Sequence, residues 1–93
     1  MSWRRHRRVS LKLPALIRTY SGATEVTHTE DVSKGGFAFT SEKDYYLGEG
    51  LMVACPYSET DTNIEVQAQI VRRQPIQGTE NKQYGVKYAG SKP

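Results

Sequence analysis

The sequence is poor in the residues that build disulfides, membrane spans and secretion signals. Its 93 residues include a single cysteine, Cys55, so no disulfide can form within the chain and no cysteine-based metal site is possible. We expect this cysteine to be a small buried apolar residue in a reducing compartment. No apolar run approaches the roughly 20 residues of a membrane-spanning helix, and the stretch after Met1 lacks the apolar core of a signal peptide. These absences predict a cytoplasmic protein without a membrane span.

Residue groupings for catalysis are also missing. The two histidines, His6 and His28, have no supporting triad or ligand cluster, and no phosphate-binding loop of Walker type is present. We also cannot assemble the metal-binding carboxylates that hydrolysis of a nucleotide would need. The sequence therefore predicts a protein that is not an enzyme and uses no metal ion or cofactor.

Positive charge is concentrated near the N-terminus. The chain has 13 Lys and Arg against 10 Asp and Glu, a net charge of +3, and four of the 13 lie between Arg4 and Arg8. This clustering indicates one contact zone for an anion rather than a generally basic protein. Residues 1–8 have no helix or strand periodicity, so we expect a flexible basic arm. The length and a hydrophobic content of 37% suit one domain with one modest core.

Most of the remaining chain has the alternating pattern of half-buried β-strands. The first predicted strand runs from Val9 to Ile17, and Pro14 within it predicts an edge, a bulge or a bend. Residues 23–31 are predicted to be a strand from their Thr and Val content. Further strands are predicted over 36–40, 51–55, 64–70 and 84–88, with loops over 41–50, 57–63 and 74–82. The apolar faces of these strands consist of Val9, Leu11, Leu13, Ala15, Ile17, Phe37, Phe39, Leu51, Val53, Cys55, Ile64, Val66, Ala68, Ile70, Tyr84, Val86 and Tyr88.

About six short strands and no amphipathic helix predict an all-β fold, either a sandwich or a barrel. A closed or nearly closed barrel also removes the exposed strand edges that so small a sheet would leave. Arg72 and Arg73 follow a predicted buried strand, so we expect them to end it at the surface. Tyr45 and Tyr46 are expected to be packing or rim residues.

Two short stretches carry most of the functional information. Asp31-Val32-Ser33-Lys34-Gly35-Gly36 has the composition of a loop between two strands, because Asp and Ser favour turns and Gly permits close backbone approach. The second stretch, Arg4-Arg5-His6-Arg7-Arg8, lies just before the first predicted strand.

Together these stretches resemble the two motifs of the PilZ domain family. Arg4 and Arg8 occupy the fixed positions of its RxxxR motif, and Asp31, Ser33 and Gly36 those of its [D/N]xSxxG motif. The resemblance covers nearly the whole chain. It implies a six-stranded antiparallel β-barrel of the split-barrel type that binds cyclic di-GMP, a bacterial second messenger. We therefore expect a single PilZ domain over 1–93, with an arm (1–8), a barrel (9–90) and a short tail (91–93).

The chemistry of cyclic di-GMP suits the matched residues. An arginine fork can donate twice to guanine O6 and N7 or to phosphate oxygens, so we expect Arg4 and Arg8 to be the main anchors and Arg5 the next. Asp31 could accept from the N1–H and N2–H₂ edge of guanine, or could instead hold an arm arginine in place. The Ser33 hydroxyl can donate to a phosphate or a guanine acceptor. Gly35 and Gly36 keep Cβ atoms away and can supply backbone N–H groups.

The sequence thus predicts a non-catalytic receptor module in which cyclic di-GMP orders the arm and changes the surface offered to a protein partner. The alternative is a small basic β-barrel that binds RNA or single-stranded DNA. Nucleic-acid binding is disfavoured because the aromatics Phe37, Phe39, Tyr84 and Tyr88 have inward-facing periods instead of forming an exposed stacking surface. The identity of the partner and the roles of Trp3, Arg7, Arg72 and Arg73 stay open.

Overall fold

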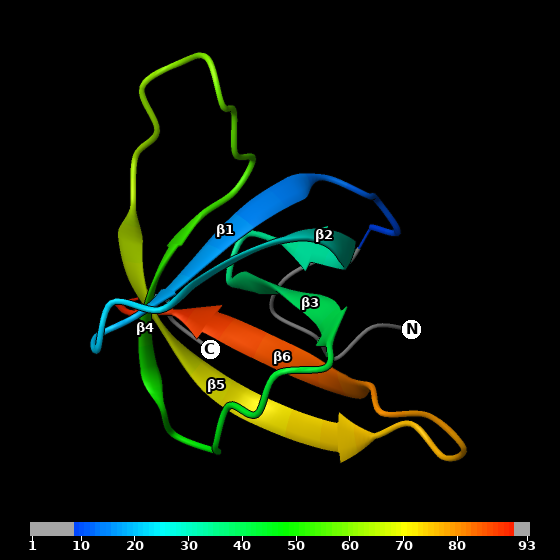
Figure 1. The fold of residues 1–93 in the computed structure, drawn as a ribbon. Coiled ribbons are helices and arrows are strands. Elements are labelled where there is room, and N and C mark those ends of the chain that lie inside the picture. The colour runs from blue at the N-terminus through cyan, green and yellow to red at the C-terminus, as the bar shows by residue number, and fades with distance from the viewer. Residues whose placement is uncertain (1–8, 91–93) are drawn as a thin grey trace.

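The computed structural model describes residues 9–90, which form one closed antiparallel β-barrel (Figure 1). The strands follow the order β1-β2-β3-β6-β5-β4 around the barrel, and the ring closes because β1 pairs with both β2 and β4. No helix occurs within these residues. The predicted all-β, six-stranded barrel is therefore confirmed. The strands are β1 (Pro14–Thr19), β2 (Thr24–Ser33), β3 (Gly36–Ser41), β4 (Gly50–Ala54), β5 (Val66–Pro75) and β6 (Lys82–Tyr88).

The barrel interior is filled by alternating apolar residues of β1, β3, β4, β5 and β6, with Tyr45 from the β3–β4 connection. Three aromatic rings pack together at its centre, with Phe39 stacked on Tyr84 at 5.3 Å and Tyr45 edge-on to Tyr84 at 5.2 Å between centroids. Such aromatic pairs contribute about 0.5–1.5 kcal/mol each beyond the area they bury. The buried core consists of Ala15, Ile17, Phe37, Phe39, Tyr45, Leu51, Val53, Ala68, Ile70, Tyr84 and Val86.

The buried hydroxyls of this core have hydrogen-bond partners. Tyr84 donates to the Lys43 carbonyl at 2.7 Å and accepts from the Tyr45 N–H at 3.0 Å. The Tyr45 hydroxyl donates to Glu25 at 2.7 Å, and burial followed by this carboxylate raises the pKa of Tyr45. The predicted packing role therefore holds for Tyr45, whereas Tyr46 is exposed.

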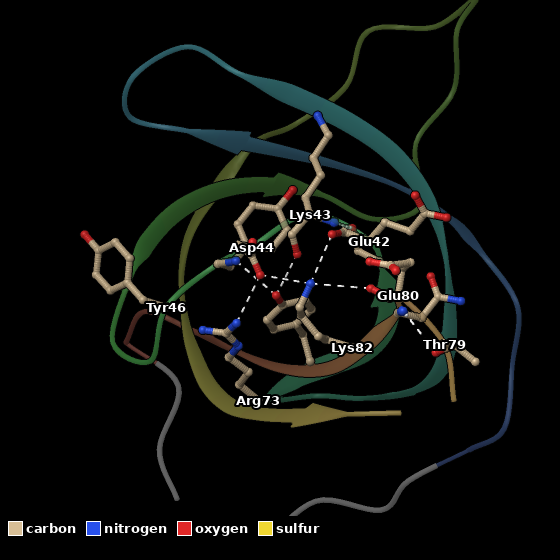
Figure 2. Close-up of polar contacts among 12 residues, drawn as sticks. Glu42, Lys43, Asp44, Tyr46, Arg73, Thr79, Glu80 and Lys82 are labelled. Atoms are coloured by element: carbon tan, nitrogen blue, oxygen red, sulfur yellow. Dashed lines mark hydrogen bonds and ion pairs between the residues drawn. The ribbon is translucent and has the colours of Figure 1, made fainter. Parts of the chain in front are cut away.

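One end of the barrel is crossed by the connection between β3 and β4, which ion pairs fasten to β5 and β6 (Figure 2). Lys82 on β6 lies 2.9 Å from the Asp44 carboxylate, and Arg73 on β5 lies 3.0 Å from it. The Lys82 ammonium also donates to the carbonyls of Glu42 and Glu80. These contacts lower the pKa of Asp44, chiefly through Lys82.

The first predicted strand is wrong over its N-terminal half. β1 begins at Pro14, and the side chains of Val9 and Leu11 are 49% and 44% exposed. Of the three alternatives predicted for Pro14, an edge, a bulge or a bend, the edge is excluded because the barrel is closed. Proline fits here because it is the first residue of β1, and β4 pairs with β1 only from Leu16 onward.

The predicted strand over 64–70 and the loop over 74–82 are both displaced toward the C-terminus in the structure. β5 starts at Val66, where its pairing with β4 starts, so Ile64 lies outside the barrel and is 81% exposed. Val66 is itself 41% exposed, against the prediction of an inward face. β5 continues to Pro75, so the hairpin loop spans only 76–81. Arg72 and Arg73 consequently lie within the strand, although both are at the surface as predicted.

Cys55 is a free thiol that is half-buried against the core. Burial raises its pKa. The predicted apolar surroundings are thus present, with more exposure than a fully buried residue would have.

Candidate functional site

The predicted loop over residues 31–36 is a tight β-hairpin corner between β2 and β3. Ser33 pairs with Gly36, so only Lys34 and Gly35 form the turn. The Ser33 hydroxyl accepts from the Gly35 N–H at 3.2 Å, and the nearest acceptor for its own proton is the Gly36 carbonyl at 3.5 Å. That second distance is long for an O–H···O bond. The Ser33 hydroxyl can therefore still donate to an incoming acceptor.

Gly36 has a role in the fold that the sequence did not reveal. A Cβ atom on Gly36 would lie 1.8 Å from the carbonyl oxygen of Val86 on β6. β3 and β6 can approach this closely only because Gly36 has no side chain. The neighbouring Gly35 carbonyl accepts from the Tyr88 N–H at 2.8 Å, which ties the corner to β6 as well.

Asp31 reaches the outer surface of the barrel because β2 contains a β-bulge. Side chains two residues apart on a regular strand share a face, and Thr29 is buried inside the barrel. The register shifts between Thr29 and Asp31, so that Asp31 pairs with Ala38, which faces outward between the core residues Phe37 and Phe39. The bulge thus turns Asp31 outward, and Ser33, two residues further on, shares its face.

The chain before β1 runs back along β2 to this corner. Val9 and Val32 exchange two backbone hydrogen bonds, each 2.9 Å long. Val32 lies between Asp31 and Ser33 in the sequence. Arg8 is bonded to Val9, and consecutive Cα atoms are about 3.8 Å apart. The predicted ligand residues Arg4, Arg5 and Arg8 lie outside the described residues, but the residue that follows them is hydrogen-bonded to the centre of the second motif.

A buried threonine holds this segment against β2. Thr29 donates its hydroxyl to the Leu11 carbonyl and accepts from the Leu13 N–H at 2.9 Å. Its own N–H donates to the Leu13 carbonyl at 2.8 Å. Three hydrogen bonds of one residue therefore fix the segment that leads to Val9. The sequence analysis missed this role, since a Thr at an inward strand position is the only signal for it.

The outer face beside Asp31 is lined by small residues. Ala38 on β3 and Gly85 on β6 are register partners, and both lie between residues that point into the core. Both are buried, and neither has a side chain beyond Cβ. With Gly36 they form a floor of small residues next to Asp31 and Ser33. The signal in the sequence was a small residue alternating with large inward ones in each strand, and the sequence analysis did not use it.

The ion-pair cluster around Asp44 is separate from this corner. Asp44 and Lys82 lie at the Ser41 end of β3, whereas the Ser33–Gly36 corner is at its other end. Five residue steps of strand separate the two ends, roughly 17 Å. The cluster fastens the barrel end and does not contribute to the candidate site.

Within residues 9–90, no three His, Cys, Asp or Glu side chains are grouped so as to hold a metal ion. The same part of the chain contains no helix long and apolar enough to cross a membrane. Phe37, Phe39 and Tyr84 are buried, so none of these rings is available to stack on a nucleic-acid base.

Comparison with known proteins relates this geometry to a family. In overall fold the chain is similar to the Bacillus subtilis inhibitor of motility MotI/DgrA, with a TM-score of 0.75 and 22% identity, covering 96% of this chain and 44% of that one. It is also similar to the PilZ domain of YcgR from Escherichia coli, solved with c-di-GMP, with a TM-score of 0.64 and 18% identity, covering 99% and 82% of the two chains. The chain thus spans less than half the length of the Bacillus chain, and no curated protein matches it.

A family model described as the PilZ domain matches residues 3–91. That range includes both arginine positions of the first motif, the whole of the second motif and all six strands. The chain belongs to the PilZ domain family.

Proposed function

We propose that this chain is a non-catalytic receptor module for cyclic di-GMP, which it binds between the arginine arm and the Asp31–Gly36 corner. The observation that carries the proposal is the pair of hydrogen bonds between Val9 and Val32. The arm has at most about 3.6 Å of reach per residue, so Arg4 can extend no further than roughly 18 Å from Val9. A dinucleotide on the outer face beside Asp31 is within this reach.

The proposed roles of the site residues follow from their charge and hydrogen-bonding capacity. Arg4 and Arg8, with Arg5 beside them, donate to the guanines and the two phosphates. Asp31 and Ser33 face the ligand from β2, and the small residues of the corner let it approach the backbone. Family membership and the cyclic di-GMP complex of the YcgR PilZ domain support the choice of ligand.

The proposed output is a change of surface. Ordering the arm on the barrel costs conformational entropy, which the charge-assisted hydrogen bonds of the ligand offset. The ordered arm and the ligand together then present a new surface to a protein partner. Because a second messenger acts inside the cell, we place this module, as one PilZ domain over residues 1–93, in the bacterial cytoplasm.

Titration calorimetry of cyclic di-GMP into Arg8→Ala and Asp31→Ala tests the two halves of the site separately. Each substitution should weaken binding by about 10-fold or more, because each removes a charged hydrogen-bond partner worth about 1.5–3 kcal/mol. Arg18→Ala is the matched control for the loss of one positive charge, since Arg18 on β1 forms an ion pair with Glu65 at 2.8 Å. Affinities like that of the wild type in both site variants would falsify the site.

A further inference from the structure

The outer face of the barrel carries one row of register partners across four neighbouring strands. Asp31 on β2 pairs with Ala38 on β3, Ala38 with Gly85 on β6, and Gly85 with Arg72 on β5. Register partners in antiparallel strands point to the same side of a sheet. A carboxylate and a guanidinium group thus stand at the two ends of a row whose middle has almost no side chains. Three strand spacings separate their backbones, roughly 14 Å along the sheet.

Arg72 reaches this face because of a β-bulge, as Asp31 does. Ile70, two residues before Arg72, points into the core and is 1% exposed. On a regular strand Arg72 would point inward too. The register of β5 shifts between Ile70 and Arg72, which turns Arg72 outward. The bulges in β2 and β5 therefore aim a carboxylate and a guanidinium group at opposite ends of the same row.

The Arg72 side chain lies over Gly85. The position that a Cβ atom would take on Gly85 is 3.5 Å from Arg72 Nε and 3.9 Å from its Cζ. Because Tyr84 and Val86 point into the core, that position is on the outer side of β6. The Arg72 side chain thus covers Gly85, at the end of the row opposite Asp31.

No hydrogen bond or ion pair within residues 9–90 holds the Arg72 guanidinium group. The neighbouring Arg73 differs from Arg72 in its register partner and in its contacts. Its register partner is Tyr84, which faces inward, and its guanidinium group donates to Asp44 at 3.0 Å across the barrel end (Figure 2). Two adjacent arginines of equal charge therefore have different surroundings, one tied to the fold and one with its five donors available over the floor.

We propose that Arg72 is a further ligand-contacting residue, whose guanidinium group lies over Gly85 and donates to the O6 and N7 atoms of a guanine that lies flat beside it, over Ala38. This inference depends on the proposed function, because it extends the same site from β2 across to β5. A flat base fits a surface without side chains, and the arginine fork matches the O6 and N7 acceptors of guanine. Asp31 stands at the other end of the row.

The test compares Arg72→Ala, Arg72→Lys and Arg73→Ala by calorimetric titration with cyclic di-GMP. Arg72→Ala should weaken binding about 5- to 150-fold, the range for one bidentate arginine–guanine contact. Arg72→Lys should weaken it nearly as much, since lysine keeps the charge and loses the fork. Arg73→Ala removes the same charge and should leave the affinity within about twofold. Melting each variant without ligand checks that the barrel is intact.

The outcomes separate this inference from the proposed function. If Arg72→Ala binds like the wild type while Arg8→Ala loses affinity, the inference is overturned and the proposed function stands. Equal weakening in Arg72→Ala and Arg73→Ala also overturns it, because general charge would then explain the effect. A wild-type chain that does not bind cyclic di-GMP overturns both.

A modified ligand tests the proposed atoms directly. A cyclic di-GMP analogue with 7-deazaguanine bases lacks the N7 acceptor and keeps both phosphates. If Arg72 donates to N7, this analogue should lose less affinity in Arg72→Ala than in the wild type, because the arginine that used N7 is already absent. Equal losses in the two proteins would contradict the contact with guanine.

Discussion

At the scale of single residues, Asp31 has two possible roles that a change of ligand can separate. If its carboxylate accepts from the guanine N1–H and N2–H₂ edge, Asp31→Ala should weaken the binding of cyclic di-GMP more than that of cyclic di-IMP, whose bases lack the N2 amino group. A lost hydrogen bond to a charged group corresponds to about 1.5–3 kcal/mol. If Asp31 instead holds an arm arginine, Asp31→Ala should weaken the binding of both ligands equally. We expect the first result, because the bulge turns Asp31 to the outer face of the barrel, where its register partner is Ala38.

Calorimetry with both ligands measures the difference, and Asp61→Ala is the control for the loss of one negative charge. Asp61 lies in the exposed loop between β4 and β5. A larger loss for cyclic di-IMP than for cyclic di-GMP would exclude both roles.

At Gly36, the addition of a single Cβ atom should lower the stability of the barrel. Gly36→Ala places a Cβ atom against the Val86 carbonyl, which is backbone and cannot rotate away. We expect destabilisation of about 3 kcal/mol, the upper end for overpacked sites, measured by urea unfolding. Gly78→Ala is the comparison, since nothing lies within 4 Å of that position and only its positive φ of +82° opposes a side chain. Equal costs in the two variants would show that the contact with the Val86 carbonyl adds no more than the backbone strain at Gly78, and would contradict the overpacking.

At the scale of elements, Thr29 connects the segment before β1 to the bulge in β2. Thr29→Val keeps the shape of the side chain and leaves the Leu11 carbonyl and the Leu13 N–H without their partner. An unsatisfied buried group costs about 1–3 kcal/mol of stability. Binding of cyclic di-GMP should weaken too, because the segment between Val9 and β1 is no longer fixed to β2. Thr27→Val is the matched control, with a hydroxyl that makes only one contact of 3.4 Å. Unfolding curves and titrations in which the two variants agree would rule out this role.

The connection between β3 and β4 should depend on pH through Asp44. Lys82 and then Arg73 lower its pKa in the folded protein below the ordinary value of 3.8. A carboxylate whose folded pKa is lowered stabilises the fold above its unfolded pKa and loses that contribution as the pH falls through the folded pKa. The wild type should therefore be slightly more stable than Asp44→Asn at pH 7, with the difference shrinking below pH 3.8 and gone once the pH is below the folded pKa. A difference in melting temperature that persists at lower pH would contradict this origin.

The strands were predictable from the sequence, and the bulges were not. Alternation identified the inward rows of β3 and β6 because a large apolar residue recurs at every second position, as at Phe37 and Phe39. A bulge adds one residue to one strand, and neither Glu30 nor Val71 differs visibly from an ordinary strand residue. Ile64 was assigned inward because alternation continues past the point where the partner strand ends. The position of a bulge and the end of a strand are set by the partner strand, so the sequence of one strand does not reveal them.

At the scale of the whole molecule, barrel closure brings together segments that are distant in the chain. The pairing of β3 with β6 sets Gly85 beside Ala38, and the hairpin of β5 and β6 brings Arg72 into the same row. The two motifs supplied the proposed roles of Asp31 and Ser33 from the sequence alone. The proposed roles of Thr29 and Arg72 depend on cross-strand register, which is a property of the closed sheet.

The central claim is that the folded chain binds cyclic di-GMP through the arm and the β2–β3 corner, and a thermal melt tests it most directly. A ligand at about 100 times its dissociation constant stabilises the state that binds it by about 2.7 kcal/mol, which corresponds to roughly 10 °C or more for a domain of this size. The account predicts this shift with cyclic di-GMP and none with cyclic di-AMP or GTP. An unchanged melting temperature at saturating cyclic di-GMP, or equal shifts with all three nucleotides, would contradict it.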